Sequence, residues 1–219
     1  MRVVYVLLKL WYIFYCIGLM MIKFIFDLDG TITKCETLPL LAKHFRVEQE
    51  IEEVTRETVR GNIPFIESFI QRVFILGKLP VDSIASLLGS IPLHSKVHDF
   101  IQKYKEHCVI ATGNIDYWVE KLLIRLGCTA YSSEGILEDN RIVKIRTILK
   151  KENVVKEYKS QGAQVVFIGD GNNDVEAMRC ADISIASGIT HQPAQSVLSV
   201  AHYLVYSEDA LCRQLYQLL

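Results

Sequence analysis

The sequence has few of the features that indicate a disulfide-stabilised, zinc-binding or nucleic-acid-binding protein. Its 219 residues include six cysteines that are widely spaced, without a C-x-x-C pair or a histidine cluster beside them. This spacing argues against zinc and for a reducing compartment, so we expect a cytoplasmic protein. Neither positive nor negative charge dominates, because 24 basic and 25 acidic residues leave a formal charge of -1. We therefore expect no nucleic-acid partner and no polybasic membrane surface, and a small molecule as the partner.

Apolar residues are plentiful, and the longest run lies at the N-terminus. Residues 3–22 carry a single charge, that of Lys9, and are about as long as a bilayer span. A signal peptide is disfavoured because no small-x-small cleavage site follows. Three interpretations of the extension at residues 1–21 stay open: a start-site artefact with Met20 or Met21 as the true start, a membrane anchor or interfacial segment, or a structured helix. The first is favoured because no linker separates the run from the next predicted strand.

Strand-like and helix-like segments alternate along the rest of the chain. Short apolar runs that end on glycine, aspartate, serine or threonine occupy residues 22–28, 109–113, 164–171, 182–188 and 202–205. Such runs are typical of parallel strands buried on both faces. Residues 114–127 repeat apolar side chains at three- and four-residue spacing and stop at Gly127, which predicts a helix. The alternation predicts an α/β protein with a doubly wound parallel sheet and a ligand site beyond the strands' carboxyl ends.

Two stretches interrupt this alternation. Residues 36–92 have a helical pattern broken by glycine and proline, which predicts four short helices forming a small cap inserted after the first strand. The core domain would then comprise residues 22–35 and 93–219. The second interruption is Asp139-Asn140, which lies between two β-like runs and predicts a hairpin turn.

Carboxylates gather at the predicted strand ends. Asp27 and Asp29 close the run "IKFIFDLDGT", and Asp170 and Asp174 close a second run in "GDGNND". Side chains two positions apart at a strand end project to the same side, so all four would face one crevice. Their repulsion is costly unless a cation neutralises it, and hard oxygen ligands of this kind suit Mg²⁺.

Each motif also has a structural interpretation. An Asp-rich turn commonly ends a strand, a threonine before a glycine commonly caps or turns, and a lysine such as Lys151 is usually a solvated charge. A calcium loop of the EF-hand type is disfavoured, because neither acidic stretch places Gly at the sixth or Glu at the twelfth loop position. The joint order of the motifs favours a functional interpretation, since each falls at or just after a strand end or opens a helix beyond one.

"DLDGT", "TG", a helix-opening lysine and "GDGNND", in this order, resemble the four-motif signature of the haloacid dehalogenase superfamily of aspartyl phosphotransferases. The resemblance covers residues 22 to about 210 and implies a Rossmann-like core. A helical cap between the first and second motifs resembles the branch that contains phosphoserine phosphatase. That branch carries a glutamate shortly after the first motif and an arginine in the third cap helix, which correspond to Glu36 and Arg72.

The resemblance implies residue roles. Asp27 would be the nucleophile that becomes an aspartyl phosphate, and Asp29 the general acid and base. Mg²⁺ would be held by Asp27, Asp29 through its backbone carbonyl, and Asp170, with Asp174 and Asn173 in support.

A second set of residues would bind the transferring phosphate. Thr112, the Gly113 amide and Lys151 are implied to contact its oxygens. Lys151 opens a predicted helix at the spacing that the family shows, and Lys144 and Lys150 are its competitors.

The resemblance also implies a substrate class. O-phosphoserine offers an ammonium group and a carboxylate, for which Glu36 and Arg72 supply one partner of each sign, and Phe65 would form the apolar wall. An ordinary Glu36–Arg72 ion pair is the structural interpretation of these two residues. The sequence reads Thr112-Gly113-Asn114 where Ser-Gly-Gly is usual, so another small phosphomonoester stays open as substrate. A phosphotransferase or phosphomutase on the same scaffold, and a catalytically silent module, stay open as well.

Overall fold

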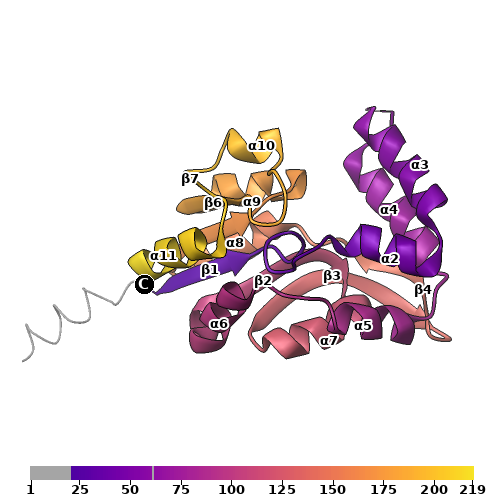
Figure 1. Ribbon diagram of the computed structural model, residues 1–219, viewed down its shortest axis with the longest axis horizontal. Helices are drawn as coiled ribbons and strands as arrows, with labels where there is room; N and C mark the ends of the chain where they lie inside the picture. The colour runs from indigo at the N-terminus through magenta and orange to yellow at the C-terminus, as the bar shows by residue number, and fades with distance from the viewer. Residues whose placement is uncertain (1–20, 61) are drawn as a thin grey trace, which may run out of the picture.

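The computed structural model describes residues 21–60 and 62–219, which contain one seven-stranded sheet (Figure 1). Its strands are β1 (Ile22–Phe26), β2 (Cys108–Ile115), β3 (Thr129–Glu138), β4 (Arg141–Thr147), β5 (Gln164–Gly169), β6 (Ile183–Ser187) and β7 (Tyr203–Val205). They are ordered β4-β3-β2-β1-β5-β6-β7, and every neighbouring pair is parallel except β3 and β4. The predicted α/β fold is confirmed. The interpretations of the N-terminal extension concern residues 1–20, which lie outside the described part.

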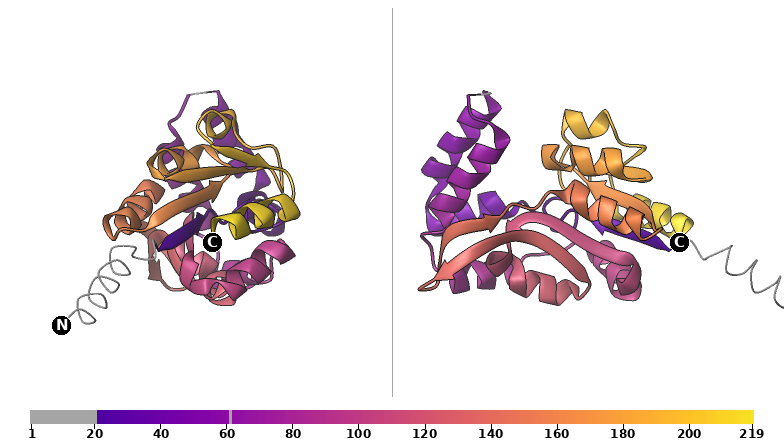
Figure 2. Two further views of the ribbon diagram at one scale, coloured as in Figure 1. Left: turned by 90° about the vertical axis from the view of Figure 1, so that its left-hand side faces the viewer. Right: turned by 180° about the vertical axis from the view of Figure 1, so that it is seen from behind.

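Helices cover both faces of the sheet (Figure 1). They are α2 (Thr37–Phe45), α3 (Glu48–Val59), α4 (Phe65–Leu76), α5 (Val81–Gly89), α6 (Ser95–Lys103), α7 (Asp116–Leu126), α8 (Lys151–Ser160), α9 (Val175–Cys180), α10 (Gln195–Leu198) and α11 (Glu208–Leu218). The pair α3 and α4 stands at one end of the molecule, and α8, α9 and α10 lie toward the other end (Figure 2). Within residues 21–60 and 62–219, none of the helices combines the length and apolar character needed to cross a bilayer.

The central strands are apolar on both sides because both sides are covered. Phe24 and Phe26 of β1 belong to the larger hydrophobic cluster, whereas Ile25 points into the smaller cluster on the other face. All three side chains are fully buried. This explains why these strands read as continuous apolar runs rather than as an alternating pattern.

Local conformation follows the sequence signals at two turns. Helix α7 ends at Gly127, whose φ of 64° lies in the left-handed region that favours glycine. Asp139 and Asn140 join β3 to β4 with φ values of 46° and 60°, as a two-residue hairpin turn requires. The predicted helix and the predicted hairpin are both confirmed.

Four helices follow β1, as predicted, but they do not pack alike. Helices α3 and α4 pack against each other, and α4 also contacts β4. Helix α5 packs against α7 beneath the sheet, and its Ile84 and Leu88 belong to the larger hydrophobic cluster. The division into a core and a cap of residues 36–92 stays a prediction.

The contact between α5 and α7 generates a first prediction. Ile84 is 0% exposed, so Ile84→Ala leaves a cavity and should lower the free energy of unfolding by about 3 kcal/mol. Ile124→Ala is the matched control on α7, because Ile124 is 71% exposed and its loss should change stability by less than about 0.5 kcal/mol. Urea denaturation followed by circular dichroism measures both, and equal losses would contradict the packing.

Candidate active site

The site forms where the two central strands end side by side. β1 pairs with β5, and the Asp27 N–H donates to the Ile168 carbonyl over 2.8 Å. Asp27 and Asp170 each follow directly after their strand, so both carboxylates lie at the carboxyl end of the sheet. From β1 the chain continues to β2 on one side, and from β5 it continues to β6 on the other side. The carboxyl ends of β1 and β5 therefore form the topological switch point, where ligands of open α/β sheets bind.

A buried lysine joins two of the predicted acidic residues. Lys151, the first residue of α8, is 3% exposed, and its Nζ lies 2.6 Å from Asp27 Oδ1 and 2.6 Å from Asp174 Oδ1. The competing lysines, Lys144 and Lys150, are exposed. Among the three candidates the geometry therefore favours Lys151 as the cation beside the predicted nucleophile.

The loop after β5 folds back on itself around Asp174. The second carboxylate oxygen of Asp174 accepts hydrogen bonds from the backbone N–H groups of Asp170 and Gly171, at 3.0 and 2.9 Å. Gly169 makes this possible, because a Cβ there would lie 2.4 Å from Asp174 Oδ2. Asp174 thereby holds both the loop and Lys151 in place.

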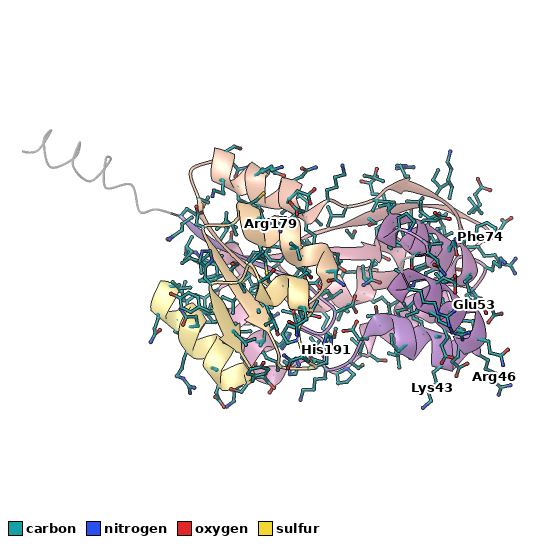
Figure 3. All side chains as sticks on the ribbon, turned by 90° about the horizontal axis from the view of Figure 1, so that it is seen from above. Lys43, Arg46, Glu53, Phe74, Arg179 and His191 are labelled. Atoms are coloured by element: carbon teal, nitrogen blue, oxygen red, sulfur yellow. The ribbon has the colours of Figure 1, made fainter. Side chains whose placement is uncertain are left out.

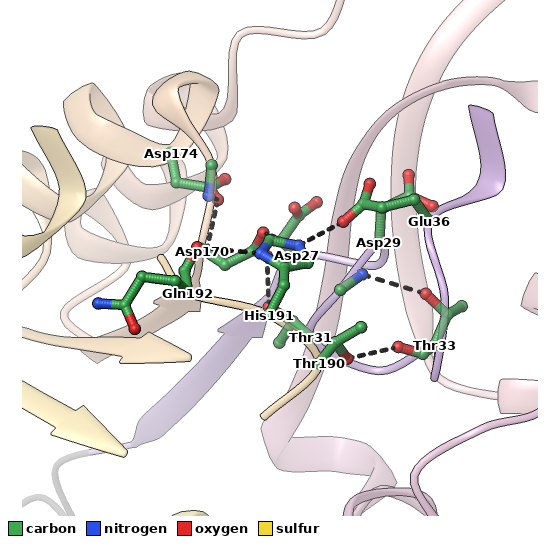
Figure 4. A network of polar contacts seen from close by, with 12 residues as sticks. Asp27, Asp29, Thr31, Thr33, Glu36, Asp170, Asp174, Thr190, His191 and Gln192 are labelled. Atoms are coloured by element: carbon green, nitrogen blue, oxygen red, sulfur yellow. Dashed lines mark hydrogen bonds and ion pairs between the residues drawn. The ribbon is translucent and has the colours of Figure 1, made fainter. Parts of the chain in front are cut away.

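His191 is a member of the site that the sequence did not predict (Figure 4). It lies in the loop after β6, between helices α2–α4 and the C-terminal helices when seen from above (Figure 3). Its Nε2 is 2.5 Å from Glu36 Oε1 and 3.2 Å from Asp170 Oδ2. The other Asp170 oxygen accepts a hydrogen bond from Thr31 Oγ1 at 2.9 Å. The position of His191 just beyond a strand end was the only signal in the sequence.

Asp29 occupies a separate position, held by neutral donors. The Thr37 N–H donates to its Oδ1 over 3.1 Å, and Asn114 Nδ2 donates to its Oδ2 over 2.6 Å. Asn114 also donates to Thr112 Oγ1 from both its backbone and its side chain, at 3.2 Å each. Asn114, where the family resemblance leads one to expect glycine, thus connects Asp29 to the predicted phosphate-binding Thr112.

Burial sets the electrostatics of the acidic groups. It raises the pKa of Asp27 well above the usual value; the charge of Asp174 raises it further, and Lys151 opposes the shift. Burial and then Asp174 raise the pKa of Asp170 to about 7. Burial also raises the pKa of Asp29, as the role of general acid and base that the resemblance implies would require. Burial opposes the charge of Lys151, but Asp174 and Asp27 hold its pKa above the usual value.

The acidic cluster fits a divalent cation. Asp27, Asp170 and Asp174 are buried, and one carboxylate oxygen from each lies within 4.8 Å of the others. An all-oxygen donor set is the type that Mg²⁺ prefers. A bound cation would relieve the repulsion that raises the pKa of Asp27 and Asp170.

A cavity of about 250 Å³ opens beside these groups. Its wall includes the predicted residues Asp27, Asp29, Glu36, Arg72, Gly113, Lys151, Asp170 and Asn173.

Thr112 is fully buried and is not part of the wall. Phe65 begins α4, but its side chain is outside the described part of the structure. Within the described residues no ion pair joins Glu36 to Arg72, so the structural interpretation of these two residues does not apply.

The close approach at Gly30 generates a second prediction. Gly30 has a φ of 67°, and a Cβ there would lie 2.7 Å from His191 Nε2 and 2.8 Å from Glu36 Oε1. Gly162 has a φ of 84° but nothing within 4 Å of its Cβ position, so Gly162→Ala isolates the cost of the left-handed backbone, about 1 kcal/mol. Gly30→Ala must also displace the ends of the His191 and Glu36 side chains, which are about 40% exposed and can move, so it should lower the free energy of unfolding by only about 0.5 kcal/mol more. Equal losses in urea denaturation would show that the site around Gly30 is loosely packed.

Comparisons with known proteins agree with this geometry. Residues 24–182 match the family model of the haloacid dehalogenase-like hydrolases. The chain is 26% identical over 175 residues to the phosphoserine phosphatase of Methanocaldococcus jannaschii, covering 74% of this chain and 83% of that protein. It is 30% identical over 175 residues to the phosphoserine phosphatase of Campylobacter jejuni subsp. doylei, covering 74% and 84%.

Solved structures share the fold. A phosphoserine phosphatase solved as a phospho-aspartyl intermediate analogue superposes with a TM-score of 0.73 at 22% identity, over 88% of this chain and 98% of that one. A substrate-bound phosphoserine phosphatase gives the same TM-score and identity, over 90% of this chain and 98% of that one. With the sequence match over residues 24–182, these findings lead to one conclusion: the chain belongs to the haloacid dehalogenase-like hydrolases, in the phosphoserine phosphatase-like branch.

Proposed function

We propose that the protein is a Mg²⁺-dependent phosphatase that hydrolyses a small phosphorylated metabolite of the phosphoserine type through an aspartyl phosphate. The observation that carries this proposal is the buried Asp27 carboxylate, which contacts Lys151 at 2.6 Å and lies within 4.8 Å of Asp170 and Asp174. The names of the relatives make O-phosphoserine the first substrate to test. A cytoplasmic location stays a prediction.

In the first half-reaction, an Asp27 carboxylate oxygen attacks phosphorus. The new bond to Asp27 forms as the bond from phosphorus to the substrate's alcohol oxygen breaks, and Asp29 donates its proton to the departing alkoxide. The raised pKa of Asp29 favours the protonated form that this step needs. Asn114 and the Thr37 N–H fix its carboxyl group in position.

In the second half-reaction, Asp29 accepts a proton from water, and the water oxygen attacks phosphorus while the bond to Asp27 breaks. Phosphate leaves, and both carboxyl groups return to their starting states. Lys151 and the Gly113 amide would stabilise the charge on the phosphoryl oxygens. Asp27, Asp170 and the Asp29 carbonyl would hold Mg²⁺, with Asp174 in support; when bound, the ion supplies charge neutralisation between nucleophile and phosphate.

Metal removal tests this proposal directly. The full chain should release phosphate from 4-nitrophenyl phosphate and from O-phosphoserine in the presence of Mg²⁺. Treatment with EDTA followed by its removal should abolish turnover, because the carboxylates then repel the incoming phosphate, and added Mg²⁺ should restore it. Turnover that persists unchanged in EDTA would contradict the proposal.

Two adjacent lysines provide a matched pair of variants. Lys151→Ala should lower kcat by at least about 100-fold, because it removes a charged donor from the transferring phosphoryl group. Lys150→Ala should leave turnover close to that of the wild type, because Lys150 is exposed at the start of the same helix. Steady-state kinetics with 4-nitrophenyl phosphate measures both, and near-normal turnover of Lys151→Ala would remove Lys151 from the proposed machinery.

A further inference from the structure

The cavity beside the acidic cluster indicates what the rest of the substrate is like. We infer that it selects a phosphomonoester that carries a carboxylate and an apolar group but no free ammonium group. This inference rests on the proposed phosphatase function and narrows its substrate class. Three features of the cavity wall carry it: the partners of its carboxylates, the cation Arg72, which lies outside the catalytic cluster, and its apolar side chains.

The carboxylates of the wall already have partners. Four acidic residues line the cavity: Asp27, Asp29, Glu36 and Asp170. Asp27 is paired with the buried lysine, both oxygens of Asp29 accept hydrogen bonds, and both oxygens of Asp170 have contacts. A substrate ammonium would therefore depend on Glu36.

Glu36 is engaged from within the protein. His191 Nε2 lies 2.5 Å from Glu36 Oε1, and the other ring nitrogen of His191, Nδ1, lies 3.1 Å from the Gln192 carbonyl. A carboxylate only accepts hydrogen bonds, so the ring nitrogen beside it is a donor. His191 does not belong to the cavity wall, but its donor contacts one oxygen of Glu36 and already offsets the charge of this carboxylate, so Glu36 gains less from a substrate ammonium.

Arg72 is in the opposite situation. Its Nη2 donates to Thr55 Oγ1 at 3.2 Å, its Nε is buried without an acceptor, and no carboxylate pairs with it within the described residues. A half-buried guanidinium without an anion favours a ligand that brings one. The wall thus offers a substrate carboxylate the guanidinium of Arg72, which has no anionic partner within the described residues. Each acidic residue of the wall, by contrast, already has at least one partner in the protein.

The remaining wall is apolar. Helices α2, α4 and α7 contribute Leu41, Phe69, Val73 and Trp118, among others. The serine part of O-phosphoserine has one methylene group and is otherwise polar, so it would leave most of this surface without contact. A larger apolar group on the substrate would cover it and gain binding free energy in proportion to the buried area.

A series of substrates with one leaving group tests the inference. O-phospho-L-serine, N-acetyl-O-phospho-L-serine and N-benzoyl-O-phospho-L-serine contain the same phosphoester and the same carboxylate. Acylation replaces the ammonium by a neutral amide, and the benzoyl group adds an apolar ring. We expect kcat/KM to rise along the series, with N-benzoyl-O-phospho-L-serine above O-phospho-L-serine by about tenfold or more.

Variants assign the effect to the wall. Phe69→Ala should reduce the advantage of the benzoyl over the acetyl substrate, whereas Phe74→Ala should not, because Phe74 is 68% exposed on the same helix and lies at the outer edge of the molecule (Figure 3). His191→Ala should free Glu36 and shift the ratio of kcat/KM values toward O-phospho-L-serine over the acetyl substrate. A ratio between two substrates is insensitive to how much metal each preparation holds.

The outcomes separate this inference from the proposed function. If 4-nitrophenyl phosphate is hydrolysed with Mg²⁺ but O-phospho-L-serine has the highest kcat/KM of the series, the inference is overturned and the phosphatase function stands. An unchanged substrate ratio in His191→Ala would also overturn it. If neither 4-nitrophenyl phosphate nor any member of the series releases phosphate, both are overturned together.

Discussion

The site depends on the pairing of a buried lysine with buried carboxylates. Taking Lys151, Asp27 and Asp174 out of water is costly, and their short mutual contacts offset that cost together with the two backbone N–H groups that donate to Asp174. The one cation, Lys151, does not neutralise the three carboxylates of Asp27, Asp170 and Asp174, so a negative charge remains at the carboxyl end of the sheet. Burial raises the pKa of Asp27 and Asp170. This imbalance would be relieved by a divalent cation, which the proposed function requires beside the proposed nucleophile Asp27.

The fold supplies this arrangement by topology rather than by local sequence alone. The strand order places β1 beside β5, so the residues that follow them meet although they are far apart in the chain. Helices α2 and α4 then provide the opposite wall of the cavity, made mostly of apolar side chains. The strand ends hold the groups proposed for chemistry, and the helices hold those proposed to choose the substrate.

Much of this could be predicted from the sequence, because parallel strands and their polar ends leave a strong pattern. Asp27, Asp29, Asp170 and Lys151 stand at element ends, where side chains converge whatever the details of packing. The contacts of His191 and Asn114 could not be predicted, because they join residues 155 and 85 positions apart and depend on how the loops fold. For the same reason the contact of His191 with Glu36 could not be predicted, whereas the binding of substrate by Glu36 and Arg72 stays a prediction. The packing of α5 against α7 likewise has no local signal.

The central claim is that Asp27 forms a covalent bond to phosphorus during turnover. Rapid mixing of the Mg²⁺-loaded protein with a substrate, quenching in acid and reduction with borohydride would convert an aspartyl phosphate to homoserine, which peptide mass spectrometry can locate. The account predicts homoserine at position 27, only when substrate and Mg²⁺ are both present, and none in Asp27→Asn. Turnover without any reduced residue, or with homoserine at another position, would contradict it.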